Sequence, residues 1–248
     1  MSPAAKKFKL KVALPIKIKL PESFINEPLF LFLKNNKLKH IELKDPQVIF
    51  AIAFIVGILD DVFIGALSGN WYSIPGVVGV LDINNIPPLI MSLIVEPGIW
   101  AFFVGFPPAL FDLFHTIQKK GILLTEQENI QTQVNGLKNV TSSRLFIISA
   151  ILLAIAIAFY AMVIIGEYQP TPWLYFGWHY WLRWLRIACS SYVSVYAVSW
   201  SLMALFTLYN VFYTAKVKVN IYDGDNAGGL LFIGKFILKV SRLTLIIV

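Results

Sequence analysis

The chain has 248 residues, 57% of them apolar, with a mean hydropathy of +0.69 and a formal net charge of +7. Soluble domains contain roughly 45–50% apolar residues, so this composition predicts lipid contact and an integral membrane protein. The lysines lie beside apolar stretches, where anionic lipid is the nearer partner, so we expect no nucleic-acid partner. The single cysteine, Cys189, excludes an intrachain disulfide and a cysteine-based metal cluster.

Residues 1–46 are predicted to form a basic arm that precedes the first long apolar run and that the charge distribution described below assigns to the cytoplasm. Lysine alternates with apolar residues over 7–12, a period of two that gives an extended chain one charged face. Such an arm either stays solvated and retains this end on one side of the membrane, or lies on anionic lipid or adds as a strand to a partner. Residues 28–44 are expected to form a short interfacial helix before Pro46 starts the first span. The remaining residues, 47–248, are assigned to one transmembrane helical domain.

Four apolar runs each approach the roughly 20 residues that an α-helix needs to cross the hydrocarbon of a bilayer. The runs are continuous rather than alternating, which favours helices over a barrel, because the backbone in lipid must satisfy its own hydrogen bonds. The sequence therefore predicts an all-α polytopic integral membrane protein with about four transmembrane helices. The runs are approximately residues 47–66, 88–111, 145–166 and 187–211.

A further apolar segment follows the fourth run and carries basic residues at helical spacing. Its basic face comprises Lys235, Lys239 and Arg242, and its opposite face comprises Ile233, Ile237 and Val240. This pattern is typical of an amphipathic helix on a membrane surface. The apolar run still continues at Val248, so a truncated fifth span is the alternative, and the sequence does not decide between them.

The distribution of basic residues predicts the orientation of the helices. Of the 21 lysines and arginines, 19 lie before the first run, between the second and third, or after the fourth. Positively charged connections are retained on the cytoplasmic side, so these three segments and the N-terminus are expected there. The other two, Arg183 and Arg186, lie before the fourth run on the opposite side.

Two adjacent aspartates, Asp60 and Asp61, lie in the outer part of the first run. Gly57 and Gly65 stand four residues before and after Asp61, and small residues on one stripe let another helix approach closely. Asp61 is therefore expected to face protein or water rather than lipid. The pair is interpreted either as a cation or proton site or as acids in the outer headgroup region.

Glu96 lies near the middle of the second run and is followed directly by Pro97 and Gly98. Proline lacks a backbone donor and clashes with the preceding turn, so we expect a kink or break there. A carboxylate beside loosened backbone can coordinate or relay a cation, and the alternative is a structural Glu96 hydrogen-bonded to a neighbouring helix. Paired prolines at both ends of the segment also permit a re-entrant hairpin, which the basic loop after it disfavours.

Aromatic residues are dense before the fourth run. The tryptophans are Trp173, Trp178, Trp181 and Trp184. Tryptophan and tyrosine prefer the headgroup level, so an outer aromatic belt is expected, with Arg183 and Arg186 contacting lipid phosphate. A bound pigment or quinone is the sharper alternative.

The fourth run carries small and hydroxyl residues on approximately one helical face: Ser190, Ser194, Ala197 and Ser201. This spacing is typical of a helix-packing surface, with a polar pore lining as the alternative. The three histidines are predicted to lie at different depths, so we expect no haem, no metal and no other cofactor.

The segment from Asp223 to Gly229 begins like a calcium-binding loop, but the twelfth position is Gly234 instead of glutamate. A flexible turn is therefore predicted. The letters Asp-Asn-Ala-Gly-Gly-Leu within it resemble a glycine-rich cytoplasmic turn in uncharacterised bacterial polytopic membrane proteins. The resemblance covers at most the last third of the chain and implies no activity.

The sequence shows no nucleophile elbow, phosphate-binding loop or kinase signature, so we expect no enzyme and assign no catalytic residue. The first functional hypothesis is a non-enzymatic subunit of a homo-oligomer or of a complex with other membrane subunits. The second is a cation channel or transporter that uses Glu96, Asp61 and Asp60.

Overall fold

The computed structural model contains four helices that are long and apolar enough to cross a membrane. It describes residues 28–35, 37–38, 41–63, 86–120, 127–168, 177–214 and 231–245. Within these ranges the chain is helical except for a hairpin of two short strands, β1 (Lys37–Leu38) and β2 (Ile41–Glu42), and short connecting turns. The predicted all-α polytopic membrane fold is therefore confirmed. The candidate spans are Pro46–Phe63, Met91–Ile117, Arg144–Ala161 and Trp181–Tyr213.

Some predicted features lie outside the described residues. They are the arm over 1–27, Gly65, Trp173 and the turn from Asp223 to Gly229.

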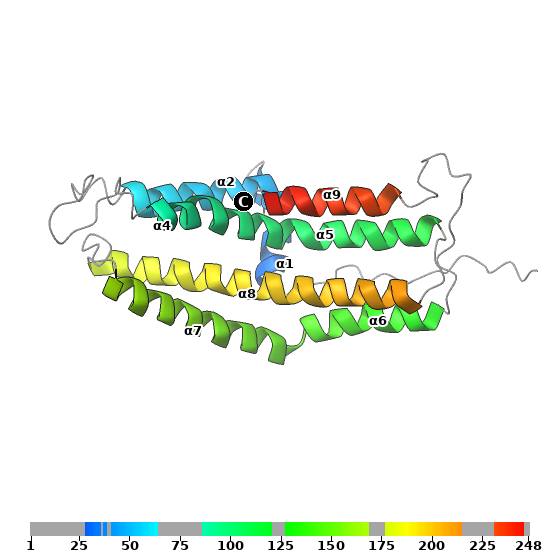
Figure 1. Cartoon of the computed structure of the whole chain (residues 1–248). Helices are drawn as coiled ribbons and strands as arrows, with labels where there is room; N and C mark the ends of the chain where they lie inside the picture. Colours follow the sequence, from blue (N-terminus) through cyan, green and yellow to red (C-terminus); the bar gives the residue numbers. More distant parts are fainter. Residues whose placement is uncertain are drawn as a thin grey trace, which may run out of the picture.

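Two long helical columns form the centre of the molecule (Figure 1). One runs without interruption through α4 (Ile86–Ile90), the π-helical η3 (Met91–Val95) and α5 (Glu96–Lys120). The other is α8 (Gly177–Thr214), with 38 residues. At a rise of about 1.5 Å per residue the columns are about 52 and 57 Å long. Since hydrocarbon is roughly 30 Å thick, the two columns are about 22 and 27 Å longer than it.

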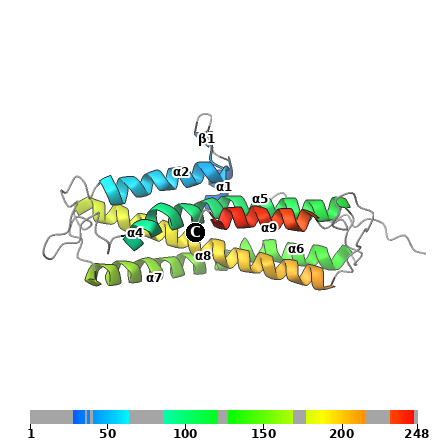
Figure 2. The same cartoon turned by 45° about the horizontal axis from the view of Figure 1, so that its top comes forward.

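Shorter helices lie end to end along these columns (Figures 1 and 2). Along α5 lie α2 (Pro46–Gly57), which continues into the π-helical η1 (Ile58–Phe63), and α9 (Leu231–Leu245). Along α8 lie α7 (Arg144–Tyr168) and α6 (Gln127–Thr141).

The four candidate spans consequently form a row in the order α2, α5, α8 and α7 (Figure 2). In the most apolar 18-residue stretch of the first span (α2 with η1), 17% is buried inside the protein, and the same holds for the third span (α7). The corresponding share for the second span (η3 with α5) is 56%. The row therefore has two edge helices that pack along one long neighbour each.

Local sequence explains where the edge helices begin. Asp45 precedes α2, and its Oδ1 accepts the backbone N–H of Gln47 at 2.9 Å, while Pro46 takes the first helical position. At α7 the hydroxyl of Ser143 accepts the backbone N–H of Phe146 at 3.2 Å. Both caps satisfy amide groups that have no partner within the helix.

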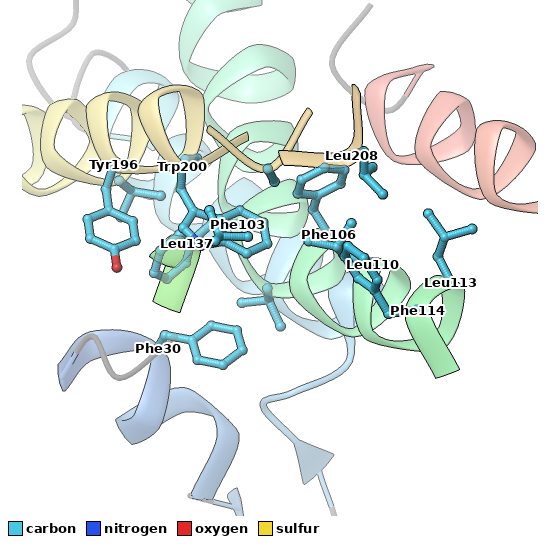
Figure 3. Close-up of a cluster of buried hydrophobic side chains, with 14 of the residues drawn as sticks. Phe30, Phe103, Phe106, Leu110, Leu113, Phe114, Leu137, Tyr196, Trp200 and Leu208 are labelled. Carbon is cyan, nitrogen blue, oxygen red and sulfur yellow. The ribbon is translucent and has the colours of Figure 1, made fainter. Parts of the chain in front are cut away.

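An aromatic core joins the two columns midway along their length (Figure 3). The rings of Phe103 and Tyr196 meet edge to face at 5.9 Å, and those of Phe106 and Trp200 at 5.2 Å. The Tyr196 hydroxyl donates to the carbonyl of Thr141 at 3.0 Å, which ties the corner between α6 and α7 to α8. This core fixes the register of the columns and hence the placement of polar groups about two to four turns away.

Three sequence expectations are resolved by this arrangement. Residues 28–44 contain a helix only at α1 (Pro28–Asn35), followed by the hairpin, so the expected interfacial helix is shorter than predicted. Residues 86–120 form one continuous helical column, so the described part contains neither a break at Pro97 nor a re-entrant hairpin.

The C-terminal α9 packs along α5, and the choice between an amphipathic surface helix and a truncated fifth span stays a prediction. The Phe236 ring lies 6.3 Å from that of Phe106, and Lys239 Nζ lies 3.0 Å from Asp112 Oδ2. Of the described helices, α9 is not among the four candidate spans.

Candidate functional site: a buried charge cluster between three spans

Five charged side chains meet where the first, second and fourth spans come together, near one end of the length of these spans. We call them the buried charge cluster: Asp60, Asp61, Glu96, Arg183 and Arg186. The aspartates lie on η1, the glutamate is the first residue of α5, and the arginines lie in the first turns of the fourth span. Three spans therefore contribute to one polar site.

Arg186 is the centre of the cluster because its guanidinium contacts all three carboxylates. Its Nη2 lies 2.8 Å from Glu96 Oε2 and 3.1 Å from Asp61 Oδ2, and its Nη1 donates to Asp60. Its Nε donates to both Glu96 oxygens at 3.3 Å. The planar guanidinium fork suits such multiple recognition of carboxylates.

The second arginine completes the coordination of Asp61. Arg183 Nη1 donates to Asp61 Oδ1 at 2.7 Å, while the other oxygen of Asp61 accepts from Arg186. The Asp61 side chain is 7% exposed and each arginine side chain 15%. Asp61 therefore faces protein, as predicted from the small residues around it.

Neutral groups extend the cluster along the α5–α8 contact. The Ser190 hydroxyl donates to Glu96 Oε1, and the indole Nε1 of Trp100 donates to Ser190 Oγ at 3.2 Å. Glu96 is thus held by Arg186 and Ser190, both on α8. This arrangement is the neighbouring-helix contact expected of a structural Glu96.

Asp60 and Asp61 lie within a π-helical segment, and Glu96 directly follows another. The Glu96 N–H bonds to the Met91 carbonyl, five residues earlier, as in a π-helix. Such a turn relieves the clash of Pro97 with the carbonyl four residues before it, so the column continues through a proline expected to kink or break it. π-Helical turns are frequent at functional sites.

The C-terminal end of α2 lies against η3 at Gly57. A Cβ on Gly57 would lie 2.8 Å from the Ser92 carbonyl oxygen and 3.1 Å from Leu93 Cδ2. Because no side chain fits in that space, glycine is required for this approach. This close contact lies about one turn before Asp60 and Asp61 on the first span and about one turn before Glu96 on the second, so it brings the three acids near one another.

The cluster carries three carboxylates and two guanidinium groups. With all of them ionised, its net charge is one negative unit. Buried ion pairs contribute little net stability, because desolvation offsets the attraction, whereas removal of one partner leaves a costly unpaired charge. The arginines also occupy the positions between carboxylates that a bound cation would need.

The structure brings together the three acids that the sequence singled out as cation-handling candidates. It also pairs them with Arg183 and Arg186, which the sequence predicts only as contacts to lipid phosphate. The available signal was that acids and arginines at the same end of their spans need partners in lipid. The lipid contacts of the arginines stay a prediction.

Glu96 lies closer to the end of its span than predicted. The second candidate span begins at Met91, five residues before Glu96, and continues to Ile117. The carboxylate is therefore level with the aspartates near the end of the first span, which permits their meeting with Arg186.

The other predicted site residues lie around the cluster or outside the described part. Trp181 is 67% exposed at the start of the fourth span and Trp184 is half-buried. Trp178 belongs to α8, but its side chain is outside the described residues, so the aromatic belt stays a prediction. On the small-residue face, Ala197 is buried and the serines are half-buried.

Within the described ranges, no group of three or more histidine, cysteine, aspartate or glutamate side chains is arranged to hold a metal ion. His115 is exposed on α5 and stacks beside Phe111 at 6.5 Å. The side chains of His40 and His179 lie outside the described residues.

Comparisons with protein-family models, with curated proteins and with solved structures find no match to this chain.

Proposed function

We propose that this membrane protein is a non-enzymatic subunit of a larger membrane assembly and that the buried charge cluster locks three of its spans into one unit. The observation that carries the proposal is Arg186, which bridges carboxylates on two other spans. An arginine in this position holds helices together and occupies the space between the carboxylates of the cluster that a cation would need.

The open row of spans supports the assembly part of the proposal. The edge helices α2 and α7 bury only 17% of their most apolar windows, so each offers most of its length to lipid or to another membrane protein. Without its central lock, a row would shear more easily than a closed bundle. The cluster is therefore suited to keep the row of spans in the shape that another membrane protein would bind.

The surplus carboxylate favours a second candidate, a transporter that exchanges one proton or cation. Three acids against two arginines leave one negative charge that a proton could neutralise within the spans. Intramembrane ionisable groups commonly mark ion or proton pathways.

One experiment separates the two candidates. The purified full chain in nanodiscs is sized by native mass spectrometry, and the same preparation in liposomes is assayed for proton and cation flux. The assembly proposal expects an oligomer, or partners retained from native membranes, with no flux. A monomer whose flux disappears in Glu96→Gln, but persists in the exposed control Asp112→Asn, would establish transport instead.

We also propose that the N-terminus is cytoplasmic, on the basis of the 19 basic residues on one side. With Cys189 replaced, a cysteine at Gly69 should react with an impermeant thiol reagent from outside intact cells, and one at Gln131 should not. Reaction at Gln131 alone would reverse the orientation.

A further inference from the structure

A cavity of about 510 Å³ lies at the opposite end of the first span from the charge cluster. It is lined by α1, by β2 and the turn that precedes α2, and by α5 where two prolines stand side by side in the sequence. Asp45 at its edge directly precedes Pro46, the first residue of the candidate span. The cavity is therefore level with the boundary of the bilayer.

The walls of the cavity are apolar. They comprise Phe30, Val104, Pro107, Pro108 and Phe111. The Phe30 ring is buried and packs edge to face on Phe103 at 5.9 Å, which fixes α1 against α5 (Figure 3). On the same helix Phe32 is 58% exposed, as expected for a side chain that enters the lipid interface.

Charged groups line the same cavity, and most of them already have partners. Glu42 pairs with Lys44 at 2.9 Å and Asp112 pairs with Lys239 at 3.0 Å, whereas Asp45 accepts the backbone N–H of Gln47 and keeps its negative charge. The remaining cation is Lys34, in the last turn of α1, and none of the described residues forms an ion pair with it.

We propose that this cavity binds one anionic phospholipid of the adjoining leaflet, with its phosphate at Lys34 and the start of an acyl chain on the apolar wall. An apolar wall, a cation that no described residue neutralises and a place at the membrane boundary together match an amphiphile with a negative headgroup. A soluble phosphate would use only the lysine and leave the apolar wall in contact with water.

The test measures lipid retained by the full-length protein in native mass spectrometry, after purification from nanodiscs of phosphatidylglycerol or of phosphatidylcholine. One phosphatidylglycerol should stay bound preferentially. Lys34→Gln should lower its retention roughly fivefold, as expected for one lysine near an anionic headgroup. Lys34→Arg should preserve it, because the charge remains.

Lys138→Gln is the matched control, since it removes one basic charge from α6, whose residues do not line the cavity. Equal losses in Lys34→Gln and Lys138→Gln would show a diffuse charge effect and overturn the site. Equal retention of the two lipids would overturn it as well. Complete displacement of the lipid by millimolar inorganic phosphate would show a phosphate site without a lipid component, which also contradicts the proposal.

Discussion

Ion pairs occur at both ends of the α5 column, but in opposite environments. At one end Arg186 and its three carboxylates are mostly buried between spans, with side-chain exposures of 11% for Asp60 and 19% for Glu96. Further along, Lys239 and Asp112 pair at 3.0 Å with exposures of 51% and 67%. The distances are similar, so the comparison teaches that burial, and not the presence of an ion pair, decides how much the fold depends on it.

The largest effect is expected from Arg186→Leu. The substitution leaves three carboxylates within the spans without their common partner, so we expect a loss of about 3–5 kcal/mol in the free energy of unfolding. The measurement is unfolding of the purified protein in mixed micelles by titration with a denaturing detergent. A loss of unfolding free energy under about 1 kcal/mol would show that the cluster contributes no more than an exposed ion pair.

A double substitution sharpens the comparison. Arg186→Leu together with Glu96→Leu removes a cation and an acid at once, and should cost less than the sum of the two single changes. The expected coupling is about 0.5–3 kcal/mol, the range for residues in one ion-pair network. The same unfolding assay on both single variants and on the double variant gives this coupling, and additive effects would contradict direct pairing.

Gly57→Ala tests the close approach that brings the acids together. Its new methyl group would lie 2.8 Å from the Ser92 carbonyl oxygen, which belongs to the backbone and cannot move freely. We expect a cost of about 1–3 kcal/mol in unfolding free energy, as for other overpacked sites. Gly234→Ala on α9 is the control, because nothing lies within 4 Å of its Cβ position, and it should stabilise the helix by up to about 1 kcal/mol.

The smallest effect is expected from Lys239→Ala at the exposed end. Removal of this partner of Asp112 should change the unfolding free energy by less than about 1 kcal/mol, and high salt should reduce the difference further. Unfolding measured at low and high ionic strength checks both statements. A salt-independent loss of several kcal/mol would mean that the pair behaves like the buried cluster.

The spans were predictable from sequence because each is a long continuous apolar run. Asp61 was predictable as a protein-facing acid because Gly57 precedes it by one turn. Its partners were not, since pairing Arg186 with residues 125 and 126 positions earlier requires the spatial order of the spans, and periodicity along one helix does not contain that order. Seen on one span alone, Arg183 and Arg186 have only lipid headgroups as nearby partners.

A kink or a break was expected at Glu96 and Pro97, and the break does not occur for a local reason. Proline forbids the usual backbone hydrogen bond, but η3 absorbs the misfit by closing its bonds over five residues. The spacing of residues after the fourth span predicts a helix, and α9 is that helix. Its packing against α5 could not be predicted, because an apolar stripe indicates that a helix is buried but does not indicate which helix it packs against.

The direction in which Asp60 and Asp61 point depends on the number of residues in the π-helical turn that holds them. Each residue advances an α-helix by about 100° around its axis, so a one-residue deletion within Ile58–Phe63 that restored α-helical turns would rotate the rest of that helix by a similar angle. Chains with the same acids and arginines but one residue fewer here would present the carboxylates to a different side. Alignment gaps in this turn therefore carry as much information as substitutions when related sequences are compared.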